Sequence, residues 1–176
     1  MDVSHIPILG FAAYSGTGKT TLLTQLIPLL KVQCLRIGLI KHSHHNFEID
    51  KPGKDSYRHR EAGASPVMVS SRFRRAVIWE RSEPSEPSLL EELSYFDKAG
   101  LDLILVEGFK REPFPKIELH RPSLGKPLLF PEDDSIIAIA SDDKFLATIK
   151  LPVFDLNRPA QIADFIVNRF LTDDPD

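Results

Sequence analysis

The chain has 176 residues, of which 42% are hydrophobic and 27% are charged, and its formal net charge is −3. The length predicts a single domain with a sizeable core, and the composition is that of a soluble globular protein. The small negative charge excludes a surface that is basic throughout, so we expect neither nucleic-acid nor membrane binding.

The cysteine content and the lack of long apolar runs predict a cytoplasmic protein. Cys34 is the single cysteine, which excludes an internal disulfide and favours a reducing compartment. The segment after Met1 has no basic region followed by an apolar core, as a signal peptide has. No apolar run approaches the roughly 20 residues of a membrane span.

Apolar runs and helical spacings alternate along the chain. Strands are predicted over 5–13, 32–42, 65–71, 74–80, 101–109, 116–120, 135–141 and 151–156. Helices are predicted over 20–31, 55–63, 88–100 and 159–170.

Several element ends carry their own signals. Pro28 should kink the first helix or end it early, and Gly63 should end the second. A capping box at Ser88 begins the third helix, and Gly100 ends it. The acidic tail over 172–176 should fray.

The alternation predicts a three-layer α/β fold with a mostly parallel sheet. The run "LDLILVEGF" (101–109) is apolar almost throughout, as in a central strand buried on both faces. We expect residues 1–176 to form one domain, with an extra β-ribbon over 66–80.

The stretch "AAYSGTGKTTLL" (12–23) matches the end of the P-loop pattern G-x-x-x-x-G-K-[ST], between a strand and a helix. This context predicts a P-loop nucleoside-triphosphate-binding fold. Ala13 replaces the first glycine, which is tolerable where φ is negative, and Gly16 can take the demanding conformation instead. The residues expected to bind nucleotide are Ser15, Gly16, Thr17, Gly18, Lys19, Thr20 and Thr21.

Each P-loop residue type has a physical reason to be there. The glycines let backbone N–H groups point at phosphate oxygens, and the helix N-terminus adds further donors. We expect Lys19 to reach the β- and γ-phosphates, Thr20 to coordinate Mg²⁺ and Thr21 to lie by the α-phosphate.

Two carboxylates are candidates for catalysis and for Mg²⁺. Glu107 ends the buried strand, where P-loop proteins hold a metal-bound water, and Gly108 allows close approach of a phosphate. Asp50 lies in the long loop after the second strand, a position typical of a switch segment that binds Mg²⁺ or orients water. An acidic strand cap and a solvated loop are the alternatives.

Three histidines, His42, His44 and His45, invite a metal interpretation. No cysteine or second histidine pair stands at zinc-finger spacing. The favoured interpretation is therefore that these imidazoles line the phosphate entrance or bond within the loop.

The stretch "SIIAIASDD" places Asp142 and Asp143 after a strand, where GTPases carry an Asn-Lys-x-Asp motif that binds guanine. The Asn-Lys part is missing, and a turn or helix cap is the alternative. Asn157 is a second candidate for contact with the base.

Four stretches together resemble the molybdopterin-guanine dinucleotide biosynthesis adapter family, MobB: "GTGKTTLL", "IKHSHHNFEIDKPGKDSYRHREAGA", "LILVEGFKREPFPKIEL" and "IIAIASDD". The resemblance covers nearly the whole chain. It implies a GTP-binding homodimer with weak GTPase activity, which supports the molybdenum cofactor guanylyltransferase or other cofactor-biosynthesis proteins. The implied ligands are GTP and Mg²⁺.

The ribbon over 66–80 agrees with the implied homodimer, because apolar residues at an edge tend to pair with a second copy. Two other functions use the same P-loop: a small-molecule kinase and an ATP-driven partitioning protein. A kinase needs an arginine-bearing lid over the phosphates. The stretch "SRFRR", with Arg72, Arg74 and Arg75, is the one candidate for it. A solvated strand edge is the alternative for these arginines.

Overall fold

The computed structural model describes residues 6–43, 46–143 and 149–172. Backbone contacts divide the chain into two compact units, 1–42 with 89–176 and the inserted segment 43–88. Each unit is described by itself. Part of the predicted frayed tail, 173–176, lies outside the described residues.

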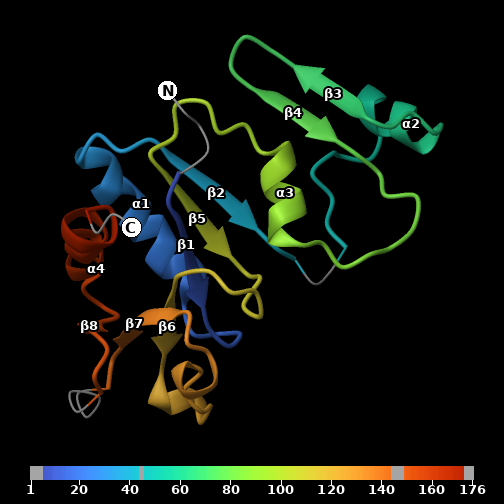
Figure 1. The fold of residues 1–176 in the computed structure, drawn as a ribbon. Coiled ribbons are helices and arrows are strands. Elements are labelled where there is room, and N and C mark those ends of the chain that lie inside the picture. Colours follow the sequence, from blue (N-terminus) through green and yellow to red (C-terminus); the bar gives the residue numbers. More distant parts are fainter. Residues whose placement is uncertain (1–5, 44–45, 144–148, 173–176) are drawn as a thin grey trace. The chain divides into compact units, whose positions relative to one another are not determined.

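A six-stranded sheet forms the centre of the first unit (Figure 1). Its order is β2-β5-β1-β6-β7-β8, and all neighbours are parallel, so every strand ends at the same edge. The strands are β1 (Ile8–Ala12), β2 (Ile37–Lys41), β5 (Leu103–Glu107), β6 (Lys116–His120), β7 (Ile136–Ser141) and β8 (Val153–Asp155). The prediction of a mostly parallel sheet is confirmed, with β5 between β2 and β1.

Helices cover both faces of this sheet, as predicted for a three-layer fold (Figure 1). One face packs against α1 (Lys19–Val32), α4 (Pro159–Phe165) and the π-helical turn Ile166–Phe170; the other packs against α3 (Leu89–Tyr95). Strand β5 contributes to both cores. Leu103 and Leu105 point towards the face covered by α1 and α4, and Ile104 and Val106 point towards the face covered by α3. Two 3-10 helices, Pro122–Leu124 and Phe130–Glu132, follow β6.

The second unit holds α2 (Asp55–Glu61) and the antiparallel pair β3 (Val67–Ser70) and β4 (Arg75–Ile78). The extra ribbon is therefore a hairpin, closed by a 2.9 Å bond from Ser71 N–H to the Arg74 carbonyl. Arg60 ties this unit together, because its guanidinium pairs with Glu48 at 2.7 Å and with Glu80 at 2.6 Å.

The first helix does not end early at Pro28, and the predicted start of the second strand is wrong. Helix α1 continues past Pro28 to Val32, because Leu26 and Leu30 on either side are fully buried and their packing outweighs one lost backbone bond. Strand β2 begins at Ile37 and not at Val32. The intervening residues end α1, where Cys34 takes a φ of 62° and donates its N–H to Lys31.

The third helix also ends earlier than predicted, at Tyr95 and not at Gly100. Asp97 accepts a hydrogen bond from the Ala99 N–H at 3.0 Å, and Leu101 N–H bonds to the Lys98 carbonyl at 3.1 Å. These local bonds give the backbone an alternative to the helix. Gly100, with a φ of 74°, lies in the turn that leads to β5.

Candidate nucleotide site

The loop over 13–18 joins β1 to α1 and has the backbone of a phosphate cradle. Gly16 and Gly18 take φ values of 82° and 105°, which only glycine adopts readily. Ala13 is outside the left-handed region, so a methyl group is tolerated there, and Gly16 takes the demanding conformation as predicted. Thr17 fixes the bend, because its hydroxyl donates to the Tyr14 carbonyl at 2.8 Å.

The start of α1 offers backbone N–H groups that no side chain caps. A Cβ built on Gly16 meets nothing within 4 Å, so the positive φ and not crowding calls for glycine at this position. Gly18 caps α1 without a side-chain bond, which leaves the first N–H groups of a fourteen-residue helix for an anion.

Lys19 is the first residue of α1, and its ammonium folds back over the loop to the Ala13 carbonyl at 3.3 Å. Partial burial lowers the pKa of Lys19 most, and the nearby ammonium groups of Lys110 and Lys41 lower this pKa further. The carboxylate of Glu107 acts in the opposite direction and raises the pKa. A triphosphate would supply the negative charge that this lysine lacks.

Glu107 lies at the same edge of the sheet, because β5 is the direct neighbour of β1 and pairs Glu107 with Phe11. Its side chain is only 12% exposed and pairs with Lys41 at 3.5 Å. Gly108 turns the chain sharply with a φ of 108°, and a Cβ there would lie 2.6 Å from the His42 Cβ. The prediction that this carboxylate serves Mg²⁺ and catalysis stays a prediction.

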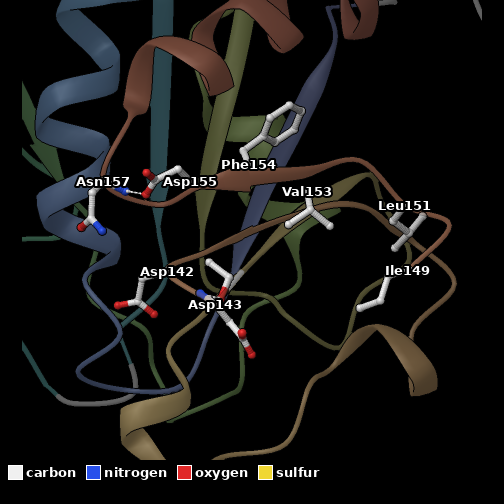
Figure 2. A pocket seen from close by; sticks show the side chains of 9 residues that line it. Asp142, Asp143, Ile149, Leu151, Val153, Phe154, Asp155 and Asn157 are labelled. Atoms are coloured by element: carbon white, nitrogen blue, oxygen red, sulfur yellow. Dashed lines mark hydrogen bonds between the residues drawn. The ribbon is translucent and has the colours of Figure 1, made fainter. Parts of the chain in front are cut away.

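A cavity of about 520 Å³ opens where β7 and β8 end (Figure 2). Asp142 and Asp143 follow β7, and Asn157 follows β8, so the three residues proposed for base contact line one cavity. Figure 2 shows Asp142 and Asn157 at one end and the apolar side chains of Ile149 and Leu151 at the other. This combination of acceptors and apolar wall suits a flat, polar-edged ring.

Arg121 is a residue of this site that sequence reasoning missed. It follows β6, the strand between β1 and β7, and its Nε donates to the Thr17 carbonyl at 2.9 Å. The same guanidinium pairs with Asp142 at 2.5 Å and approaches the Asn157 Oδ1 at 3.5 Å. Its only sequence signal is its place at the carboxyl end of a strand, the same signal that selected Glu107 and Asp142.

Asp50 belongs to the second unit, so its proposed meeting with the P-loop stays a prediction. Its Oδ1 accepts bonds from Lys51 N–H at 2.9 Å and from the Ser56 hydroxyl at 3.0 Å. Its Oδ2 is buried and has no hydrogen-bond partner among the described residues. A buried carboxylate oxygen in this state fits a cation ligand, which agrees with the proposed Mg²⁺ role.

The histidines form no metal site in the part of the chain that is described, where no group of three potential ligands occurs. His42 follows β2, and its ring stacks on Phe109 in the turn after β5, with ring centroids 4.7 Å apart. His44 and His45 lie outside the described residues.

The sheet order and the loop after β1 define the class of this protein, which has the P-loop NTPase fold. Residues 8–142 match the family model described as molybdopterin guanine dinucleotide synthesis protein B, MobB. The chain belongs to this family, which confirms the family predicted from the motifs.

Relatives and solved structures agree with this assignment. The chain is 48% identical to the molybdopterin-guanine dinucleotide biosynthesis adapter protein of Haemophilus influenzae, over 94% of this chain and 90% of that one. It is 47% identical to the Escherichia coli adapter protein, over 92% of each. A crystal structure of Bacillus subtilis MobB superposes with a TM-score of 0.72 at 26% identity, over 92% of this chain and 96% of that chain.

Among the described helices, none has the length and apolar character to cross a membrane.

Proposed function

We propose that this protein is a cytoplasmic GTP-binding adapter in molybdopterin-guanine dinucleotide biosynthesis. It binds GTP with Mg²⁺, hydrolyses it slowly, and acts as a homodimer beside the cofactor guanylyltransferase or other proteins of cofactor biosynthesis. The names of the relatives, as adapter proteins of this biosynthesis, support the biological role.

One observation carries the proposal for the ligand. The phosphate loop after β1 and the acidic cavity after β7 and β8 share one edge of the sheet. Open α/β sheets bind nucleotides at this edge. Carboxylates at the cavity favour guanine, because its N1–H and N2–H groups donate where adenine offers no such pair.

We expect GTP to bind more tightly than ATP, and a carboxylate at the cavity to cause the difference. Replacement of the residue that contacts the base, by Asp142→Asn or Asp143→Asn, should weaken GTP about tenfold or more and ATP much less. Calorimetric titrations of GTP and ATP, with and without Mg²⁺, measure both effects. Asp164→Asn, on the exposed side of α4, is the matched control.

Equal affinities of the unchanged protein for GTP and ATP would contradict guanine selection. Equal losses of GTP and ATP in both variants would move base recognition to another residue, with Asn157 next to be replaced. No binding of either nucleotide would overturn the proposed function itself.

The ribbon of the second unit supports the proposed homodimer. Met68, Val69 and Trp79 on its strands and flank are 60%, 45% and 55% exposed, and such an apolar ribbon tends to pair with another copy. Light scattering at micromolar concentration should give about twice the chain mass of 19.8 kDa. Met68→Lys should shift the protein towards monomer, whereas Leu90→Lys, at a 79% exposed position on α3, should not. A monomeric unchanged protein would refute the dimer.

A further inference from the structure

Arg121 joins three segments that are far apart in the sequence. Its guanidinium contacts the carbonyl of Thr17 in the phosphate loop, the carboxylate of Asp142 after β7, and the Asn157 amide oxygen after β8. The strand order explains this reach, because β6 lies between β1 and β7.

The contacts of Arg121 suit the rigid, planar guanidinium group of arginine. Arginine offers five N–H donors in one plane and stays charged at all relevant pH values. Its partners here are all oxygen acceptors: one backbone carbonyl, one carboxylate and one amide oxygen. The side chain is 29% exposed and Asp142 is 32% exposed, so solvent only partly screens the pair.

We infer that Arg121 is a positioning residue, which fastens the phosphate loop to the base cavity and so fixes the spacing between the two halves of the nucleotide site. The inference rests on the proposed nucleotide function. Arg121 also places a cation near the end of β7, where this chain lacks the Asn-Lys portion of a guanine-binding motif. It also gives Asp142 a second task, since one carboxylate oxygen already holds Arg121.

The contacts distinguish this role from direct action on the phosphates. The Nε–H points at the Thr17 carbonyl, and the nearest guanidinium atom lies 3.9 Å from a Cβ built on Gly18. The Nη1 group donates to the Asp142 carboxylate. The guanidinium is therefore bonded to the protein's own acceptors.

The test compares a ligand that fills both halves with one that fills only the phosphate half. GTP and inorganic tripolyphosphate are titrated by calorimetry into the unchanged full chain, Arg121→Met, Arg121→Lys and the control Arg36→Met. Arg36 also holds a carboxylate, Asp102, at 3.0 Å, but at the amino end of β2. We expect Arg121→Met to weaken GTP about tenfold or more and tripolyphosphate less than threefold.

The GTP affinity of Arg121→Lys should lie between those of the unchanged chain and Arg121→Met, because one ammonium does not span three acceptors. Asp142→Asn added to Arg121→Met should cost GTP less than Asp142→Asn alone, since the two residues act as a unit. Equal weakening of GTP and tripolyphosphate would overturn the inference and make Arg121 a phosphate ligand. Unchanged GTP binding would overturn it as well.

A nucleotide-independent measurement separates this inference from the proposed function. Amide hydrogen exchange of the loop 13–18 in the free protein should be faster in Arg121→Met than in Arg36→Met or the unchanged chain. If GTP does not bind at all but this difference is seen, the proposed ligand is wrong and the fastening stands. Identical exchange in all three proteins would refute the fastening whatever the ligand.

Discussion

Replacing Lys19 with alanine should weaken GTP binding about 10- to 100-fold and leave the fold intact. The ammonium lies over the phosphate loop, 3.3 Å from the Ala13 carbonyl, and a charge-assisted contact of this kind contributes about 1.5–3 kcal/mol. Calorimetry measures the affinity, and circular dichroism checks the fold. Lys31→Ala, at the exposed end of α1, should leave GTP binding unchanged.

The lowered pKa of Lys19 adds a pH dependence to this result. Burial and the neighbouring cations disfavour its charged form in the free protein. GTP affinity should fall as pH rises through this lowered pKa and the ammonium loses its charge. The fall should begin at a lower pH than it would for an exposed lysine. The Lys19→Ala variant should lose that part of the pH dependence. If the Lys19→Ala variant has a native spectrum and binds GTP as the unchanged protein does, the P-loop interpretation is contradicted.

Hydrolysis of GTP by the isolated protein should be slow, near ~10⁻⁴–10⁻³ per second, whereas kinases turn over at roughly 1–100 per second. The edge of the sheet offers Lys19 and Glu107, and Arg121 is bonded to Thr17 and Asp142. Arg121 is therefore bonded within the protein and, in that arrangement, is not available to the γ-phosphate. Single-turnover hydrolysis at saturating enzyme measures the rate.

Glu107→Gln and Asp50→Asn should each reduce this low rate, the first chiefly by loosening Mg²⁺. Glu132→Gln, at an exposed 3-10 helix, is the control. A rate that rises with protein concentration would indicate that Arg72, Arg74 or Arg75 acts across the dimer. A rate above about one per second without a partner would refute the adapter proposal and favour the kinase.

The sequence determined the layers of the fold and the phosphate loop, because both are written in local patterns. Period-2 and period-3.6 spacings depend on neighbouring residues only, and the apolar run of β5 correctly predicted an interior strand buried on both faces. The loop motif likewise predicted the demanding conformation of Gly16, whose φ is 82°. The helix predicted to run to Gly100 ends at Tyr95, because local bonds such as that from Ala99 N–H to Asp97 compete with it, so that predicted end was wrong.

The tertiary structure alone decided which strand ends meet. Arg121 and Thr17 are 104 residues apart, and no periodicity or motif couples them. Their contact exists because β6 pairs with β1, and the cavity exists because β7 pairs with β8. Strand order is a property of long-range pairing, which contributes its stability only after distant segments have met. The chain by itself therefore specified a phosphate loop, and the order of the sheet decided which residues surround it.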